Sequence, residues 1–413
     1  MMTGWSPSLE EIEEALEVVH RVTQPTPLES SRFLAEILGV PRVFMKCENL
    51  QRTGSYKIRG AYNRLSKLTP KERSLGVVAA SAGNHAQGVA FAARELGIKA
   101  TIFMPLGVAL PKLQATRNYG ANVIFEGTDV EHALQAANNF AKDTGAVLVP
   151  PFDHKDVITG QGTIALEIFD IQPDIETMIV PIGGGGLISG VAVAAKEWAK
   201  KTGRPMKIIG VQAENSAAFV PALKSGKPVT IKARPTIADG IAVARAGSLN
   251  LDIVKDYVDE IVTVSDDQIA TAILLLLERA KLVVEPAGAA AVAAILSGQL
   301  EVKGETGLIL SGGNIDPILL QRVIGHGLAA AQRYQKLRIS LRDRPGELVR
   351  TAQIVADHDA NVIEVLHTRH GTGLPISDVE LELHIETRSK EHGDEVVQAL
   401  RADGYEVRVG ERY

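Results

Sequence analysis

The chain has 413 residues, of which 45% are hydrophobic and 23% are charged, so it can bury the cores of two or three domains. Its formal net charge is −5 and it has no basic block, which argues against nucleic-acid binding. No apolar run reaches the roughly 20 residues of a membrane span, the first residues are acidic, and Cys47 is the single cysteine. We therefore expect a soluble, cytoplasmic protein with no internal disulfide and no nucleic-acid or membrane partner.

Short apolar runs alternate with longer amphipathic stretches between about residues 75 and 330. The pattern predicts strands at 76–80, 100–104, 122–125, 177–180, 208–211 and 307–310, with helices after them, including 85–96, 111–119 and 129–144. Such repetition is typical of a parallel sheet covered by helices on both faces. Ligands of these sheets bind beyond the carboxyl ends of the strands, so the loops at those ends are the candidate site.

The hydrophobic period changes to two near residue 335. Leu337, Ile339 and Leu341 alternate with polar residues, which predicts a half-buried strand. A turn at 343–346, a helix at 347–358, strands at 361–369 and 379–385, a helix at 395–402 and a strand at 405–409 complete the region. The order strand-helix-strand-strand-helix-strand is that of the split ferredoxin-like unit, so we predict a separate C-terminal domain.

Two loops of the larger region carry polar side chains in positions suited to chemistry. Lys57 lies just past the turn residue Gly54, where desolvation would favour its nucleophilic form; an ordinary surface lysine is the alternative. The turn Ser81–His85 follows a predicted strand, and its backbone N–H groups could bind a carboxylate or a phosphate. Capping of the following helix by Ser81 and Asn84 is the alternative there.

Two further loops are rich in glycine. Gly183 to Gly186 join a predicted strand to a helix, so a phosphate could approach their exposed N–H groups; a purely structural use is the alternative. The loop is neither a Walker motif nor a dinucleotide fingerprint, which argues against a nicotinamide dehydrogenase. Ser311 follows the last predicted strand of the larger region. Its hydroxyl could hydrogen-bond a ligand, and an ordinary turn residue is the alternative. Glu285 precedes Pro286 at a predicted helix start. A carboxylate there could stabilise the helix dipole or take part in catalysis, and the sequence favours neither role.

In order and spacing, these four segments resemble those of the fold-type II pyridoxal-phosphate (PLP) enzymes, specifically the threonine dehydratase and serine racemase group. The resemblance implies a two-lobed, parallel-sheet α/β catalytic domain over residues 1–330, with a large lobe of 1–47 and 152–330 and a small lobe of 48–151. Residues 331–413 resemble an ACT domain, an amino-acid-sensing form of the ferredoxin-like βαββαβ unit. Its characteristic turn runs from Asp343 to Leu348.

The resemblance also implies a role for each motif residue. Lys57 would carry the PLP Schiff base and act as the general base, with Tyr56 beside the ring, Asn84 on the 3-hydroxyl and Ser311 on the pyridine nitrogen. The phosphate would be held by Gly183, Gly184, Gly185 and Gly186, and the substrate carboxylate by Ser81, Ala82, Gly83 and His85. A serine at the pyridine nitrogen does not keep that nitrogen protonated, which favours β-elimination over transamination.

Two departures from the racemases favour dehydration. Racemases of this group have a serine acid/base where this chain has Ala82, which has no proton to donate. The racemases also hold a divalent metal with a Glu and an Asp, and this chain has Gln212 and Ala218 at those positions. We therefore predict no divalent metal site, while a monovalent ion stays open. The expected reaction converts L-threonine to 2-oxobutanoate and ammonia, and L-serine to pyruvate. Serine racemase and a non-catalytic amino-acid-sensing protein are the alternatives.

The ACT resemblance implies regulation and assembly. An amino-acid effector, isoleucine or valine, would bind near Asp343, Pro345, Gly346 and Glu347. ACT domains commonly pair side by side, so we expect a homodimer or a homotetramer.

Overall fold

The structure is a computed structural model that describes residues 4–330, 333–369 and 378–410. The chain forms two compact units, Met1–Pro317 and Ile318–Tyr413, so the division precedes the helix α14 (Pro317–Ala330), whereas the sequence pattern places it after this helix. Among the described residues, no helix is long and apolar enough to cross a membrane.

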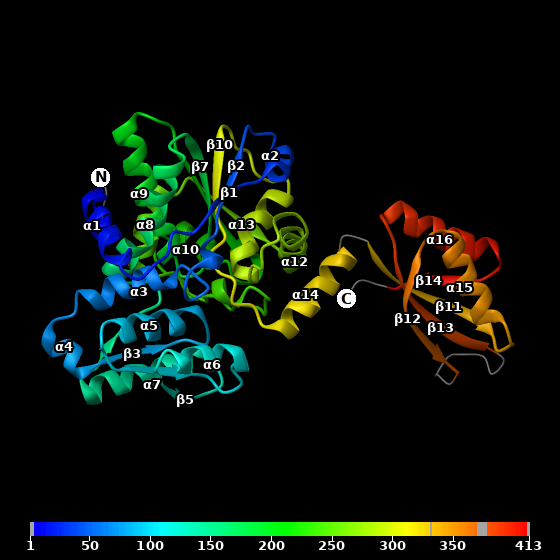
Figure 1. Ribbon diagram of the computed structural model, residues 1–413, viewed down its shortest axis with the longest axis horizontal. Helices are drawn as coiled ribbons and strands as arrows, with labels where there is room; N and C mark the ends of the chain where they lie inside the picture. Colours follow the sequence, from blue (N-terminus) through cyan, green and yellow to red (C-terminus); the bar gives the residue numbers. More distant parts are fainter. Residues whose placement is uncertain (1–3, 331–332, 370–377, 411–413) are drawn as a thin grey trace. The chain divides into compact units, whose positions relative to one another are not determined.

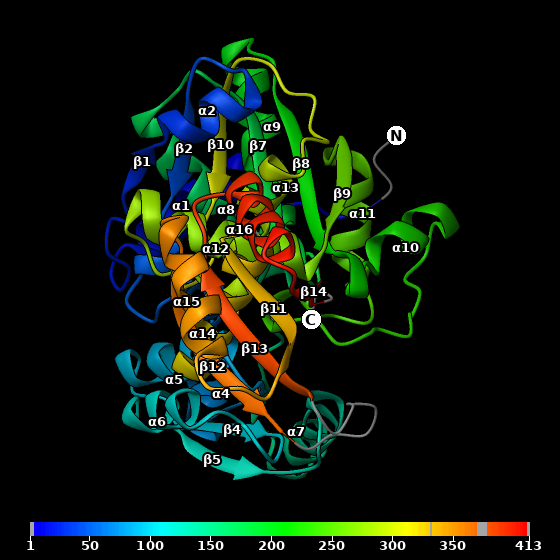
Figure 2. The ribbon, with the colours of Figure 1, turned by 90° about the vertical axis from the view of Figure 1, so that its right-hand side faces the viewer.

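A six-stranded sheet forms the centre of the first unit. Its strand order is β1-β2-β10-β7-β8-β9, which Figure 2 shows from left to right. Neighbouring strands are parallel except for the edge strand β1, which is antiparallel to β2. The bounds are β1 Leu28–Ser30, β2 Val43–Lys46, β7 Ile175–Pro181, β8 Lys207–Ala213, β9 Glu260–Val264 and β10 Glu305–Ile309.

A second, fully parallel sheet of four strands lies in the same unit, below the first in Figure 1. Its order is β5-β4-β3-β6, with β3 Val77–Ala80, β4 Ala100–Met104, β5 Asn122–Phe125 and β6 Val147–Leu148. The sequence pattern predicted one parallel sheet; instead the strand–helix units divide between two, and β1 breaks the parallel order. The predicted strands themselves are confirmed, while β1, β2, β6 and β9 were not predicted.

Helices cover both faces of each sheet, as the strand–helix alternation predicts (Figure 1). On the large sheet, α8 (Lys155–Ile171), α9 (Gly186–Thr202) and α11 (Ser248–Tyr257) pack opposite α13 (Pro286–Leu296) and α2 (Arg32–Leu38). On the small sheet, α5 (Asn84–Glu95) packs opposite α7 (Val130–Thr144). The remaining helices are α1 Leu9–Val19, α3 Lys57–Ser66, α4 Pro70–Leu75, α6 Leu110–Asn118, α10 Phe219–Ser225 and α12 Asp266–Leu275.

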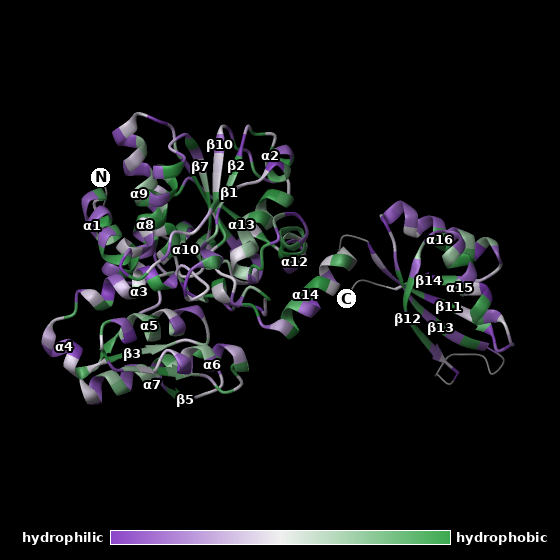
Figure 3. Ribbon diagram, in the orientation of Figure 1, coloured by the Kyte–Doolittle hydropathy of each residue, from purple (hydrophilic) through white to green (hydrophobic). Residues whose placement is uncertain are grey.

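The core follows from the apolar strands and from helices that are hydrophobic all round. Every residue of β3 is buried, and so is β7 apart from Glu176. Residues 286–295 of α13 are all buried, so this helix is an interior element rather than an amphipathic surface helix. Figure 3 shows hydrophobic colour along α13 and along the inner strands of the large sheet, while α1 is mostly hydrophilic.

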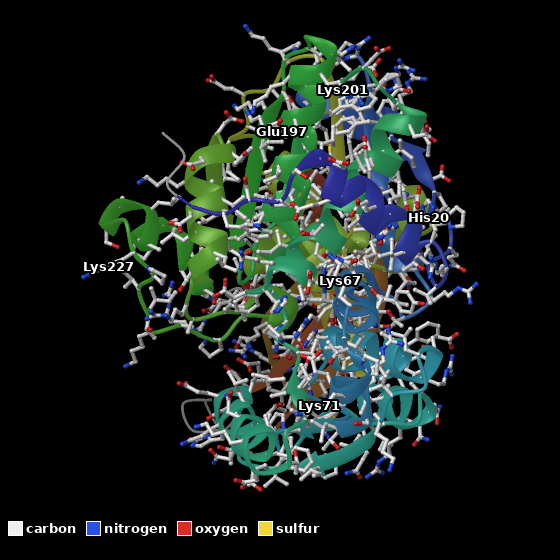
Figure 4. The ribbon with its side chains drawn as sticks, turned by 90° about the vertical axis from the view of Figure 1, so that its left-hand side faces the viewer. His20, Lys67, Lys71, Glu197, Lys201 and Lys227 are labelled. Carbon is white, nitrogen blue, oxygen red and sulfur yellow. The ribbon has the colours of Figure 1, made fainter. Side chains whose placement is uncertain are left out.

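A buried cluster of charges connects α3 to the large sheet and to α8. The Arg59 guanidinium is fully buried and binds both Glu48 and Glu167, with N–O distances of 2.6–2.8 Å. The Lys46 ammonium, also buried, contacts Glu167 at 2.7 Å. The half-exposed His20, which Figure 4 labels, contacts the same carboxylate at 3.2 Å. Two buried cations therefore compensate the charge of two carboxylates, of which Glu48 is fully buried and Glu167 is 11% exposed.

We expect this cluster to make the stability of the protein sensitive to acid. Burial alone would raise the pKa of Glu167, but the hydrogen bonds and charge of Arg59, with Lys46, lower this pKa from 4.5 to about 2. A carboxyl with a depressed pKa stabilises the folded state above its unfolded pKa and loses that contribution as pH falls. The contribution is about 3 kcal/mol at neutral pH and should disappear between about pH 4.5 and 2.

Urea unfolding of the wild type and of Glu167→Gln at pH 7, 5, 4 and 3 would measure this effect. The wild type should be clearly more stable at pH 7, and the two curves should converge as the pH falls. Parallel curves over the whole range would contradict the assignment to Glu167.

The second unit has a four-stranded antiparallel sheet and two helices after α14. Its sheet order is β12-β13-β11-β14, and the chain order is β11 α15 β12 β13 α16 β14, which confirms the predicted ferredoxin-like unit. Leu337, Ile339 and Leu341 are buried as predicted. The bounds are β11 Tyr334–Arg342, α15 Glu347–Asp357, β12 Asn361–Thr368, β13 Asp378–Glu386, α16 Lys390–Ala402 and β14 Glu406–Val409.

Candidate active site

Lys57 is the first residue of α3 and lies at the junction of several loops. Its side chain is half-buried, and its Nζ donates a hydrogen bond to the Pro151 carbonyl at 2.9 Å. The same Nζ lies 5.1 Å from the centre of the Tyr56 ring. A Cβ at Gly88 of α5 would lie only 3.1 Å from the Lys57 carbonyl carbon, so glycine there lets the two helices approach closely. Lys57 is therefore held between the two sheets rather than displayed on the surface.

The turn after β3 offers backbone N–H groups together with a nearby cation. Gly83 is the N-cap residue of α5 and no side chain caps this helix, so the alternative in which Ser81 and Asn84 cap it is wrong. Ser81 Oγ accepts a hydrogen bond from the Gly83 N–H at 3.1 Å. The Lys112 ammonium lies 3.9 Å from the position of a Cβ on Gly83. An anion such as a carboxylate would find both helix N–H groups and a positive charge there.

The side chain of His85 is directed away from this turn. It is buried and its Nε2 lies 2.8 Å from the Val149 carbonyl, which can only accept, so Nε2 carries the proton. Burial, together with the charge of Lys57, lowers the pKa of His85 from 6.5 to about 3. The imidazole is therefore neutral, and His85 can offer the site only its backbone N–H.

The four glycines join β7 to α9 and are enclosed by other segments. Gly185 has a φ of 103°, a left-handed conformation that favours glycine. A Cβ at Gly184 would overlap the Phe152 ring, and one at Gly186 would lie 2.9 Å from Phe152 atoms. No side chain caps α9, and among the described residues no protein acceptor binds the N–H groups of Gly183, Gly184 or Gly185. The loop is thus tightly packed and presents free backbone N–H donors at the N-terminus of α9.

The loop after β10 pairs directly with the loop that carries Lys57. Ser55 and Gly312 form a β-bridge, and the Tyr56 N–H donates to the Ser311 carbonyl at 3.2 Å. Ser311 is buried, and so is Ser55, whose hydroxyl is the buried side-chain oxygen of this bridge without a hydrogen-bond partner among the described residues. Ser311 therefore lies next to the loop that carries Lys57, where a serine side chain could contact a ligand heteroatom.

Contacts between these loops bring the predicted residues together. Lys57 binds the carbonyl of Pro151, whose neighbour Phe152 packs on the tetraglycine loop, while the Tyr56 N–H binds Ser311. Asn84 also lies beside the Ser311 loop, since a Cβ at Gly312 would be 3.1 Å from its Nδ2. The four segments, which are far apart in sequence, therefore surround one region at the carboxyl ends of β3, β7 and β10.

Three charged residues of this region were not assigned to the site from the sequence. Glu285, at the start of α13, is 3% exposed and accepts a hydrogen bond from Asn84 Nδ2 at 2.7 Å. Lys112 of α6 pairs with Asp239 of the short helix η3 (Asp239–Ile241) at 2.7 Å. Glu285 had a visible signal, a carboxylate between apolar residues, whereas Lys112 and Asp239 look like ordinary surface residues in the sequence.

The arrangement fits PLP, a cofactor that needs an amine for its aldehyde, donors for its phosphate and polar contacts on its ring. Lys57 could supply the amine, the uncapped N-terminus of α9 could supply N–H donors, and Asn84 and Ser311 lie where they could contact the ring. Among the described residues, no group of three or more His, Cys, Asp or Glu side chains is placed to hold a metal ion.

Substitution of Gly184 by alanine should weaken cofactor binding. The new methyl group would collide with the Phe152 ring, and relieving the collision must displace the loop, at a cost of about 1–3 kcal/mol. We expect a lower melting temperature and about a tenfold or larger rise in the Kd for PLP. Gly325→Ala is the matched control, because nothing lies within 4 Å of a Cβ there and PLP affinity should not change. Equal PLP affinity in both variants would contradict the close packing of this loop.

Comparisons with known proteins agree with this geometry. The family described as "Pyridoxal-phosphate dependent enzyme" matches residues 19–312. An L-threonine ammonia-lyase of Thermotoga maritima is 48% identical over 403 residues, which cover 97% of this chain and 99% of the relative. A maize serine racemase structure has a TM-score of 0.72 at 34% identity and covers 79% of this chain and 99% of its own. The processed form of threonine deaminase isoform 2 from Solanum lycopersicum has a TM-score of 0.71 at 35% identity and covers 78% and 95%. The chain therefore belongs to the pyridoxal-phosphate-dependent enzymes, within the group that contains the threonine ammonia-lyases and the serine racemases.

Proposed function

We propose that the protein is a PLP-dependent L-threonine ammonia-lyase that forms 2-oxobutanoate and ammonia, and that it also converts L-serine to pyruvate. The observation that carries this proposal is the position of Lys57 between the uncapped tetraglycine loop, Asn84 and Ser311. The full-length similarity to a threonine ammonia-lyase supports the choice of substrate.

PLP, when bound, supplies the electron sink that makes the α-proton of an amino acid acidic. Lys57 would hold the cofactor and, once the substrate amine has replaced it, would accept the α-proton as the general base. Tyr56, whose ring lies beside the Lys57 amine, would line this position. Gly183, Gly184, Gly185 and Gly186 would bind the phosphate through their backbone N–H groups.

The remaining contacts would orient the substrate and limit the reaction. The Ser81–Gly83 turn and the His85 N–H, at the uncapped start of α5, would bind the substrate carboxylate, with Lys112 adding a positive charge. Ser311 is neutral, so it would not hold the pyridine nitrogen in its protonated form. This favours loss of the β-hydroxyl over longer-lived carbanion chemistry. Ala82 provides no proton for the opposite face of the substrate.

The product spectrum tests the proposal directly. Purified protein with PLP should release 2-oxobutanoate and ammonia in equal amounts from L-threonine, and pyruvate from L-serine. A chiral assay should show D-serine forming from L-serine far more slowly than pyruvate. Faster formation of D-serine would reverse the choice in favour of a racemase, and a colourless, inactive protein would favour an amino-acid sensor.

The second unit would regulate the enzyme as an ACT domain by binding isoleucine or valine. Asp343, Pro345, Gly346 and Glu347 form the turn between β11 and α15, where Gly346 has a φ of 96° and caps α15. Asp343 pairs with Arg369 at 3.3 Å, and Glu347 accepts a hydrogen bond from the Tyr405 hydroxyl at 2.8 Å. Burial and this bond to Glu347 raise the pKa of Tyr405 to about 12.

Titration of isoleucine, valine and serine against threonine turnover would test regulation. An effector should change the rate in the wild type and lose potency in Gly346→Val, which would strain the turn. Indifference to all three amino acids would leave the second unit without this regulatory role.

The same unit supports assembly into a homodimer or homotetramer. The edge strand β12 exposes Ile363, Val365 and Leu366, with exposed fractions of 52%, 42% and 45%. An apolar edge strand of this kind is normally covered in a stable protein. Light scattering with size exclusion should give a mass of two or four chains, and a single-chain mass would contradict the proposal.

A further inference from the structure

A chain of side-chain amides connects Glu285 to the loop that carries Lys57. Asn314 Nδ2 donates to the Thr53 carbonyl and to Asn84 Oδ1, both at 2.8 Å. Asn84 Nδ2 in turn donates to Glu285 Oε1 at 2.7 Å. All of these groups are buried or half-buried, so water is a poor substitute for the protein partners.

The two ends of this chain determine which way each amide points. A backbone carbonyl can only accept, so the NH₂ end of Asn314 must face Thr53. An ionised carboxylate can also only accept, so the NH₂ end of Asn84 must face Glu285. With both ends acting as acceptors, the orientation of Asn84 has a single solution, in which its carbonyl oxygen faces Asn314.

Gly312 allows Glu285 to occupy this position. A Cβ at Gly312 would collide with the Glu285 carboxylate. The Glu285 N–H donates to the Gly312 carbonyl at 3.0 Å. The same loop carries Ser311, so Glu285 contacts the supports of both proposed ring contacts.

We infer that Glu285 is a positioning residue that orients Asn84 so that an amide N–H, and not the carbonyl, faces the 3-oxygen of the cofactor. This inference rests on the proposed cofactor contact of Asn84. A donor at that oxygen favours its anionic form over the protonated hydroxyl. Glu285 thereby influences the electronic state of the ring without touching it.

The charge around Glu285 makes this orientation dependent on pH. Burial first, and then the charge of Asp239 in η3, raise the pKa of Glu285 from 4.5 to about 7. Lys112 of α6, the bond from Asn84 and the charge of Lys57 in α3 oppose that rise. As the pH falls through about 7, the carboxyl gains a proton and can donate, so it no longer acts as a pure acceptor toward Asn84.

Absorption spectra and PLP titrations of the wild type and four variants would test the inference. The bound cofactor absorbs in the visible region when its 3-oxygen is anionic and in the near ultraviolet when it is protonated. In Glu285→Ala, the visible-to-ultraviolet ratio should fall and the Kd for PLP, measured by titrating the apoprotein, should rise about fivefold, which corresponds to one lost hydrogen bond. Glu285→Gln should restore most of the affinity through its carbonyl but lose the dependence of the ratio on pH between 6 and 8.

Two further variants separate the explanations. Asp239→Asn removes a neighbouring charge without touching Asn84, so it should keep the wild-type ratio at pH 8 and move the transition to lower pH. The same loss in Asp239→Asn as in Glu285→Ala would overturn the inference in favour of a general charge effect. If Asn84→Ala changes the spectrum while Glu285→Ala does not, the inference fails and the cofactor contact stands. If neither changes the spectrum, the cofactor contact of Asn84 fails.

Discussion

Replacement of Lys57 by alanine should remove both the visible absorption of the bound cofactor and the turnover of threonine. The ammonium is the cation placed between the tetraglycine loop and the Ser311 loop, through the contacts of Pro151 and Tyr56. Without it, the protein loses the amine that binds the aldehyde and the general base for the α-proton. A general base alone contributes about 10²–10⁴-fold, so the rate should fall by at least about 10³-fold.

Lys67 provides the matched control, because it follows the last turn of the same helix. Its side chain is 47% exposed and pairs with Asp156 at 3.2 Å, and Figure 4 places it at the surface. Lys67→Ala should keep the wild-type spectrum and rate. Stopped-flow measurement of 2-oxobutanoate and an absorption spectrum would decide both cases. Retained turnover in Lys57→Ala would remove the basis of the proposed function.

The parts of the site that were predictable from the sequence depend on local backbone geometry. The predicted site residues lie in loops at strand ends or at helix starts, where short motifs determine the conformation. They are Lys57, Ser81–His85, Gly183–Gly186 and Ser311. The structure brings these loops together through contacts that the parallel strand–helix pattern implies. The ferredoxin-like unit was equally predictable, because a period of two and a regular element order are local signals.

The parts that were not predictable depend on pairs of residues distant in sequence. Arg59 meets Glu167 across more than a hundred positions, and Asn84 meets Glu285 across an even longer stretch. Such polar residues have no periodic signal, because their burial is decided by the partner and not by the neighbours in the chain. The edge strand β1 was missed for a related reason: it has three residues, and its antiparallel pairing depends on β2.

The largest expected loss of stability follows from removal of Arg59. Its guanidinium is fully buried; burial opposes its charge, but the carboxylates of Glu48 and Glu167 raise the pKa of Arg59 above its usual value. Arg59→Met would leave Glu48, itself fully buried, without its counter-charge. Breaking a buried pair in this way costs about 3–5 kcal/mol. The N-terminal part of α3 would lose one of its bonds to α8, so the affinity for PLP should fall as well.

Chemical denaturation and PLP titration of Arg59→Met, Arg59→Lys and Arg32→Met would separate the effects. Arg32 is 93% exposed and pairs with Glu36 four residues later, so its loss should leave both measurements unchanged. Arg59→Lys keeps the charge but cannot bind two carboxylates with paired N–H groups, so it should be intermediate. Wild-type stability in Arg59→Met would show that the cluster does not stabilise the fold. Reduced stability with unchanged PLP affinity would show that α3 keeps Lys57 in place without the bonds of Arg59. We expect the stability and the PLP affinity to fall together. That result requires that Arg59 and the reactive lysine share one rigid helix.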